Sequence, residues 1–219
     1  MYVNADFSRR LIVTPDAYHW VASPQPGVKR MMLERLGAEQ GRATSIVRYA
    51  TDSHFPPHTH PDGEEIFVLS GVFSEGNAHY PAGWYMRNPP GSSHRPSSAG
   101  GAVIFVKLRY MKASEQESVR IDTNDAAHWR EFAGGAVCAL YSDETERVAL
   151  VRLDARVPLP YGRAAELFVL DGELRVDGQG YAAGSWLRMP EGDHAEIGAG
   201  GAGATVYIRT RGPAEAEAA

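Results

Sequence analysis

The sequence EIFVLSG at residues 65–71 is central to the fold because a close copy of it occurs once more in the chain. The copy is ELFVLDG at residues 166–172, at an offset of 101 residues (166 minus 65). Runs of Val, Ile, Leu and Phe that end at a glycine are typical of β-strands bounded by turns. Further turn-forming residues match at the same offset: Gly83 and Gly184, Pro89 and Pro190, Gly91 and Gly192. The chain is therefore predicted to contain two copies of one β-rich unit.

Shorter matches extend the repeat toward the N-terminus. Val47-Arg48 corresponds to Val151-Arg152, and His19-Trp20 corresponds to His128-Trp129. The offset of the first pair is 104 residues, three more than 101, and implies that the second copy lacks three residues before its central strand. The polar stretch 113–125 (ASEQESVRIDTND) separates the copies. We therefore expect a first domain over residues 1–115, a second over 122–210, and a disordered tail over 211–219, which has little apolar surface to bury.

Both copies are predicted to be all-β. Short runs rich in Val, Ile, Phe and Tyr alternate with clusters of Gly, Pro, Asp and Ser, a pattern of strands and turns. Residues 29–36 (KRMMLERL) have helical propensity, but the equivalent residues 136–141 (AVCALY) are typical of a strand. Tertiary context often overrides local propensity, so we expect strands at both places. About 100 residues of short strands per copy favours a double-sheet barrel.

Composition and charge exclude several classes of protein. The net charge of −5 argues against nucleic-acid binding, which needs a basic surface. No apolar run approaches the roughly 18 residues of a membrane span, and the N-terminus does not resemble a secretion signal. The one cysteine, Cys138, excludes a disulfide framework and is expected to be buried. A cytoplasmic protein without membrane or nucleic-acid partners fits these features. The sequence is also compatible with a homodimer.

A group of candidate metal ligands occurs only in the first copy. His58, His60 and Glu64 lie in the stretch HTHPDGEE, and His94 ends the stretch PPGSSH. Residues two apart in a strand point to the same face, so His58 and His60 can present two imidazoles to the barrel interior. The Pro-Asp-Gly turn then returns the chain with Glu64 toward the same space. Three imidazoles and a carboxylate predict one divalent ion per chain, Zn or Fe first, with Ni or Mn as alternatives.

These residues resemble the two motifs of the cupin family: His-x-His, three residues, Glu, six residues, Gly; then Gly, five residues, Pro-x-Gly-x-x-His. Residues 87–94 (RNPPGSSH) followed by 105–109 (FVKLR) resemble the ChrR-like cupin family, whose name comes from the ChrR anti-sigma factor. The resemblance implies a bicupin, two tandem jelly-roll barrels of which the second is a degenerate repeat. The sequence departs from the family pattern at Ser98, where cupins usually have Asn. It also has no counterpart of the helical zinc-binding domain of ChrR, so anti-sigma activity by that domain is not expected.

The second copy is predicted to have lost its metal site. Its residues at the ligand positions offer no imidazole and no carboxylate: Leu159, Tyr161, Ala165 and Ala195. His194 lies one position early, and a shift of one residue turns a strand side chain to the other face, so we expect it at the surface or in a turn.

The same comparison distinguishes two candidate carboxylates, Glu64 and Glu65. The metal-free copy retains Glu166 at the Glu65 position but has Ala165 at the Glu64 position. A residue that is retained without a metal site has a structural role. We therefore expect Glu64 to be the ligand and Glu65 to face the opposite side of its strand.

Two functions fit the cupin resemblance. The first is a sensory or regulatory metal-binding module. The alternative is an Fe(II)-dependent dioxygenase that cleaves a small diketone or hydroxyketone, because a metal with open positions can bind such a ligand. In either case a small molecule is the expected partner at the metal. An apolar pocket beside the ion would favour the enzyme, whereas a small closed site would favour a structural ion. His54, four residues before His58 in the sequence, fits either a role close to the metal or an exposed loop position.

Overall fold

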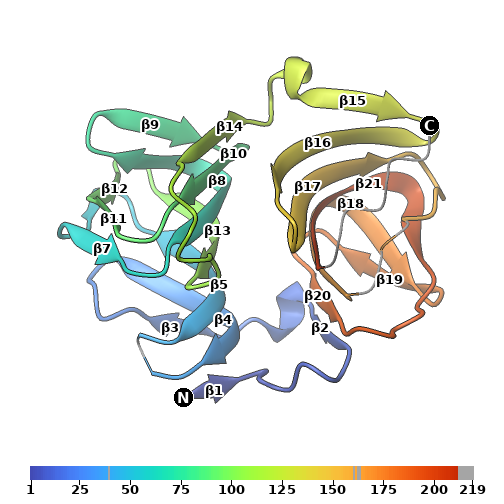
Figure 1. The fold of residues 1–219 in the computed structure, drawn as a ribbon, viewed down its shortest axis with the longest axis horizontal. Coiled ribbons are helices and arrows are strands. Elements are labelled where there is room, and N and C mark those ends of the chain that lie inside the picture. Colours follow the sequence, from blue (N-terminus) through green and yellow to red (C-terminus); the bar gives the residue numbers. More distant parts are fainter. Residues whose placement is uncertain (39, 160, 162–163, 212–219) are drawn as a thin grey trace. The chain divides into compact units, whose positions relative to one another are not determined.

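The computed structural model describes residues 1–38, 40–159, 161 and 164–211. Most of them form strands, and two short 3-10 segments, η1 (Pro15–Ala17) and η2 (Ala126–His128), are the helical elements of this described part. The all-β prediction is confirmed. The chain forms two compact units (Figure 1): unit 1 contains Met1–Ala5 and His19–Asn124, and unit 2 contains Asp6–Tyr18 and Asp125–Ala219.

Unit 1 is built around one large antiparallel sheet and a small two-stranded sheet. The large sheet has the order β1-β4-β5-β13-β8-β10-β14, and the small one pairs β7 with β11. The strands are β1 Tyr2–Val3, β3 Trp20–Ala22, β4 Val28–Leu36, β5 Arg42–Tyr49, β6 Ser53–His54, β7 His58–His60, β8 Glu64–Glu75, β9 Ala78–Pro81, β10 Trp84–Asn88, β11 Ser92–His94, β12 Pro96–Ser98, β13 Ala102–Leu108 and β14 Val119–Asp122. The segment with helical propensity is strand β4, as the repeat predicted.

Unit 2 repeats this arrangement. Its sheet has the order β15-β16-β17-β21-β18-β20-β2, with β19 paired to β18. The strands are β2 Leu11–Val13, β15 Trp129–Phe132, β16 Gly135–Ser142, β17 Glu146–Leu153, β18 Ala164–Val176, β19 Gln179–Ala182, β20 Trp186–Met189 and β21 Ile197–Arg211. Trp20 in unit 1 and Trp129 in unit 2 even keep the same contact, because Arg48 and Arg152 each stack 4.2 Å from the centre of the respective ring.

The domain boundaries differ from the sequence prediction at three places. Residues 6–18, expected in the first domain, belong to unit 2, where β2 pairs with β20. Residues 119–122, expected in the linker, form β14, which pairs with β10 of unit 1. The edge strand β14 of unit 1 therefore comes just before the main part of unit 2 in the sequence. The edge strand β2 of unit 2 comes just before the main part of unit 1. Arg211, expected in the disordered tail, ends β21, whereas residues 212–219 lie outside the described part.

The glycine that ends each repeated motif lies where its strand bends close to the neighbouring strand. Gly71 and Gly172 both have a φ of +72°, a conformation that costs other residues free energy. An added Cβ would lie 2.1 Å from the Gly101 carbonyl oxygen in unit 1 and 2.3 Å from that of Gly203 in unit 2. The repeated glycine is therefore required by the barrel and not by a ligand.

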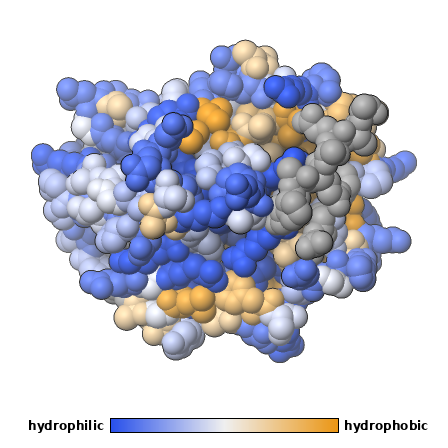
Figure 2. Space-filling view, viewed as in Figure 1, coloured by the Kyte–Doolittle hydropathy of each residue, from blue (hydrophilic) through white to orange (hydrophobic). Residues whose placement is uncertain are grey.

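The interior of each unit contains the apolar residues of the repeated strands. In unit 1 the core includes Ile66, Val68, Met86 and Ile104, and in unit 2 it includes their counterparts Leu167, Val169, Leu187 and Val206. Figure 2 shows one face of the molecule, on which hydrophilic residues cover most of the surface. None of the helices in the described residues has the length and apolar character of a membrane span.

Candidate metal centre

Strands β7 and β11 bring the three predicted histidine ligands together. The two strands pair antiparallel with His94 opposite His58 and Ser92 opposite His60. Opposite residues on paired strands present their side chains to the same face, and residues two apart on one strand share that face as well. The His-x-His spacing in β7 and the Pro-Pro-Gly turn before β11 thus place three imidazole rings in one group.

The distances within this group match the edges of a metal coordination polyhedron. His60 Nε2 lies 2.9 Å from His94 Nε2, and His94 Nε2 lies 3.3 Å from His58 Nε2. Ligand atoms about 2.1 Å from an ion are separated by about 3.0 Å in an octahedron and about 3.4 Å in a tetrahedron. The three histidines therefore form a group that could hold a metal ion.

Glu64 faces this group from the start of β8. Its Oε2 lies 3.4 Å from the Nε2 of both His60 and His94 and accepts a hydrogen bond of 3.2 Å from the Asn88 side-chain amide. Glu65, the next residue, has its Oε2 2.7 Å from Arg87 Nη1. The two carboxylates therefore face different partners, as the repeat comparison predicted, and this supports Glu64 as the fourth ligand.

Two histidines have their second ring nitrogen held by an acceptor. His58 Nδ1 lies 3.0 Å from the Pro56 carbonyl oxygen, and His94 Nδ1 lies 2.5 Å from Glu75 Oε1. A carbonyl oxygen or an ionised carboxylate only accepts hydrogen bonds, so Nδ1 carries the proton and Nε2 presents its lone pair to the group. Partners of this kind orient the histidines in metal sites.

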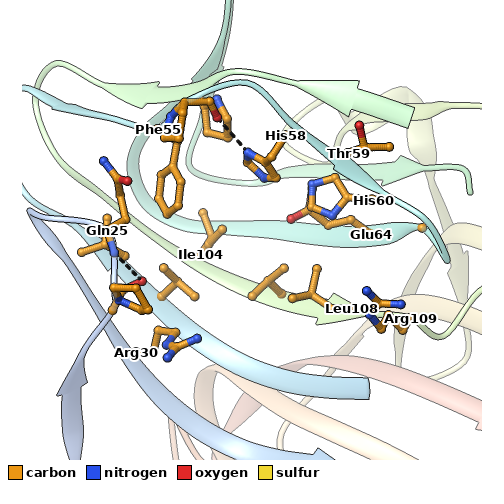
Figure 3. A pocket seen from close by; sticks show the side chains of 18 of the residues that line it. Gln25, Arg30, Phe55, His58, Thr59, His60, Glu64, Ile104, Leu108 and Arg109 are labelled. Carbon is orange, nitrogen blue, oxygen red and sulfur yellow. Dashed lines mark hydrogen bonds and ion pairs between the residues drawn. The ribbon is translucent and has the colours of Figure 1, made fainter. Parts of the chain in front are cut away.

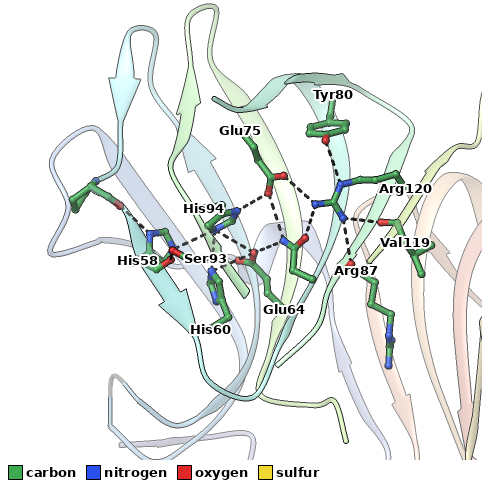
Figure 4. A network of polar contacts seen from close by, with 12 residues as sticks. His58, His60, Glu64, Glu75, Tyr80, Arg87, Ser93, His94, Val119 and Arg120 are labelled. Carbon is green, nitrogen blue, oxygen red and sulfur yellow. Dashed lines mark hydrogen bonds and ion pairs between the residues drawn. The ribbon is translucent and has the colours of Figure 1, made fainter. Parts of the chain in front are cut away.

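Glu75 belongs to a polar network behind His94 (Figure 4). Arg120 donates to Glu75 Oε2 at 3.0 Å and to the Asn88 side-chain oxygen at 2.6 Å. Asn88 in turn donates to Glu64, so this network connects two of the four candidate ligands. It comes from β8, β10 and β14, the last of which lies in the stretch that the sequence predicted as a linker.

Burial changes the acid–base properties of the group. It lowers the pKa of His60 to about 3, with help from the charges of His94 and His58, and it also lowers the pKa of His58. For His94, burial opposes the hydrogen bond to Glu75, but that bond and the nearby carboxylates raise the pKa. Burial raises the pKa of Glu64 to about 7. A divalent cation would compensate the charge of this buried carboxylate, and it binds neutral imidazoles.

Sequence reasoning missed Glu75 and Arg120, although the repeat contained a signal for the first. At the offset of 101, Glu75 corresponds to Val176 and Asn88 to Met189, and both replacements lie in the apolar core of unit 2. Arg120 required the structure. Arg120 pairs with Met86 as Ile12 pairs with Leu187, so its counterpart Ile12 lies before residues 19–124, the main part of unit 1.

In unit 2 an apolar core replaces the candidate site. Leu159, Ala165 and Ala195, three of the four predicted substitutes, are buried members of that core. Tyr161 packs against it, and its hydroxyl donates to the backbone oxygens of Asp193 and Ala195. His194 is exposed, as predicted.

A cavity of about 490 Å³ opens beside the candidate metal centre in unit 1. His58, His60 and Glu64 line one wall (Figure 3), and the apolar side chains of β5 and β13 line the floor: Val47, Ile104, Val106 and Leu108. A cavity of this volume lies in the range of small-molecule sites, roughly 300–1,000 Å³. The group of histidines is therefore open to a ligand on one side.

Other sequence-level expectations have clear outcomes. His54 is exposed and does not line the cavity, as one of the two interpretations predicted, but it lies in strand β6 and not in a loop. Cys138 is fully buried, and burial raises the pKa of its thiol to about 11. Arg87, which corresponds to Arg188 at the offset of 101, is buried between Glu65 and Glu115, so its role is structural.

Comparison with solved structures finds the same fold over nearly the whole chain. A candidate dioxygenase from Nostoc punctiforme has a TM-score of 0.78 at 16% identity, covering 96% of this chain and 85% of that one. The bacterial pirin YhhW of Escherichia coli, solved in complex with nickel(II), has a TM-score of 0.68 at 13% identity, covering 94% and 100%. The coconut allergen cocosin has a TM-score of 0.69 at 12% identity, covering 94% and 86%. At these identities the comparisons show the fold.

Comparison with curated proteins finds no match. The family model described as the ChrR cupin-like domain matches residues 8–112. That range contains the four candidate ligands. By its jelly-roll strands and its similarity to these solved structures, the protein has the cupin fold, and residues 8–112 match the ChrR cupin-like family model.

Proposed function

We propose that unit 1 binds one divalent metal ion through His58, His60, Glu64 and His94, and that the protein is an Fe(II)-dependent dioxygenase acting on a small diketone or hydroxyketone. The observation that carries this proposal is the open cavity beside the histidines. A metal ion that only stabilises a fold is usually enclosed by its protein ligands, whereas a catalytic ion keeps a position for the substrate.

The donor set fits this chemistry. Three imidazoles and one carboxylate suit Fe(II), and they also suit Zn, Ni or Mn. The His60 and His58 imidazoles are held neutral by burial, and Asn88 holds Glu64 in place. When bound, the ion would act as a Lewis acid for two ketone oxygens and supply the redox chemistry that oxidation by O2 requires.

The other cavity residues would position the substrate. Val47, Ile104 and Val106 offer an apolar floor for its hydrocarbon part, and burying that part displaces water from the reacting end. Glu75 and Asn88 contact candidate ligands, not the cavity floor. We expect them to keep His94 and Glu64 oriented toward the ion.

A sensory or regulatory role is the second candidate, and the match to the ChrR cupin-like family supports it. In that case the same metal and cavity would bind a small molecule without turnover. The two candidates therefore share the binding site and differ in whether the ligand is consumed.

Oxygen uptake tests the proposal. The protein is purified without added metal, its metal content is measured by elemental analysis, and it is loaded with Fe(II) under nitrogen. We expect oxygen consumption with acetylacetone or a related β-diketone, in proportion to bound iron, and none from His60→Ala. A loaded protein that binds the diketone without consuming oxygen would contradict the enzyme and leave the sensory role. A protein that retains no metal would contradict both.

A further inference from the structure

We propose that the cavity selects an anionic ligand, with Arg30 on β4 binding a carboxylate at the end of the cavity away from the histidines. This inference deepens the proposed function, and it rests on that function for the position of the metal-binding end of the ligand. It assigns a substrate class: a small β-dicarbonyl compound that carries a carboxylate.

The sheet register places Arg30 on the inner face of the barrel. Arg30 pairs with Val47, and Val47 pairs with Ile104. Directly paired residues project to the same side of a sheet. All three line the cavity, and Figure 3 shows the Arg30 guanidinium across the cavity from His58 and His60, with Ile104 between them.

The charge of the cavity favours an anion. Its lining includes three arginines, Arg30, Arg35 and Arg109, and two carboxylates, Asp62 and Glu64. This leaves one net positive charge, and a divalent ion in the metal centre raises the excess to three. Asp62 forms an ion pair with Arg109, and the other two lining arginines, Arg30 and Arg35, lie on β4. A cavity with low-dielectric walls and one sign of charge concentrates ligands of the opposite charge.

Unit 2 shows that the barrel itself does not require an arginine at this position. The row in unit 1 is Arg30, Val47, Ile104 and Val68. The equivalent row in unit 2 consists of Val137, Val151, Val206 and Val169. Arg48 of unit 1 and Arg152 of unit 2, in contrast, are equivalent residues, and they stack on equivalent tryptophans. Arg30 therefore occurs together with the histidines, as Glu64 does, and not with the structural arginines.

The expected ligand has two polar ends and a short apolar middle. One end binds the metal ion, the middle contacts Val47 and Ile104, and the carboxylate receives hydrogen bonds from Arg30. An arginine fits this role because its planar guanidinium can donate two parallel hydrogen bonds to a carboxylate.

Two probes with the same β-diketone test this assignment: 4,6-dioxoheptanoate, which ends in a carboxylate, and 4,6-dioxoheptanamide, which ends in a neutral amide. Isothermal titration of the zinc-loaded full chain measures both dissociation constants without turnover. We expect wild type to bind the acid about tenfold tighter than the amide. Arg30→Gln should reduce this ratio to about one, and Arg30→Lys should retain part of it.

Lys29→Gln is the matched control. It removes the same charge from the adjacent, exposed residue and should keep both the ratio and the metal content. Equal binding of the two probes by wild type, an unchanged ratio in Arg30→Gln, or no binding of either probe to metal-loaded protein would overturn the anion assignment. Elemental analysis distinguishes its failure from that of the proposed function. If the protein retains no metal but binds the acid through Arg30, the metal role fails and the anion site stands; if it binds neither, both fail.

Discussion

Units 1 and 2 use the same strand register around very different interiors. In unit 1, Glu64 pairs across the sheet with Asn88 and faces the histidines. In unit 2 the same pair of positions holds Ala165 and Met189, both buried in the apolar core. The network behind the ligands differs in the same way, because Glu75 and Arg120 correspond to Val176 and Ile12.

This difference shows that the polar residues of the centre depend on one another. A buried carboxylate or guanidinium without its partner costs several kcal/mol, so the absence of one member makes the others unfavourable. Unit 2 has apolar residues and Tyr161 in place of the set, whereas it keeps Glu166 and Arg188, the counterparts of Glu65 and Arg87. Among these residues, those with a polar counterpart in both units support the barrel, and those that are polar only in unit 1 belong to the site.

The largest expected effect comes from removing a ligand from unit 1. Wild type should bind one metal ion per chain, and His60→Ala should lower its affinity by more than about 100-fold, since even partners of ligands contribute about 10–100-fold. Circular dichroism should show an unchanged β-fold, because the apolar core does not include the ion. His194→Ala in unit 2 is the control and should keep the metal. One ion per chain in His60→Ala would disprove the assignment.

Adjacent carboxylates on β8 should behave differently. Glu64→Gln should reduce the metal content after dialysis, because an amide replaces the anionic ligand. Glu65→Gln should keep the metal but lower the free energy of unfolding by about 1–3 kcal/mol, since buried Arg87 loses a carboxylate partner. Elemental analysis and urea denaturation measure the two effects. The opposite pattern would mean that the two residues exchange roles.

Substitution of Arg120 by its unit 2 counterpart tests the network behind the ligands. Arg120→Ile leaves all four candidate ligands in place but removes the donor to Glu75 and Asn88. We expect metal affinity to fall about 10–100-fold, measured by competition with a chromophoric chelator. Arg48→Gln, which removes an arginine outside the network, should leave affinity unchanged. If Arg120→Ile also has wild-type affinity, the network does not support the metal.

The smallest effect should be equal in the two units. Arg48→Ala and Arg152→Ala each remove a guanidinium stacked on a tryptophan, a contact worth about 0.5–1 kcal/mol at exposed sites. Thermal denaturation should show similar small losses of stability, and metal content should not change. Loss of metal from Arg152→Ala would show that unit 2 influences the centre.

The sequence alone determined the β-fold, the twofold repeat and the three histidines, because these depend on local spacing. Strand periodicity places His58 and His60 on one face, and comparison of the two copies separates Glu64 from Glu65. The comparison of the two copies also predicted correctly that β4 is a strand, against its helical propensity. What these features share is that residues close in sequence, or equivalent in the two copies, carry the information.

The tertiary structure decided which distant segments complete each unit. Residues 6–18 belong to unit 2, and residues 119–122 belong to unit 1, so the polar stretch that resembled a linker contains Arg120 of the network. Edge-strand pairing depends on backbone hydrogen bonds that any residue except proline can form, and the sequence therefore gives little indication of the partner. The cavity and the inward position of Arg30 likewise depend on the register of four strands that are far apart in the chain.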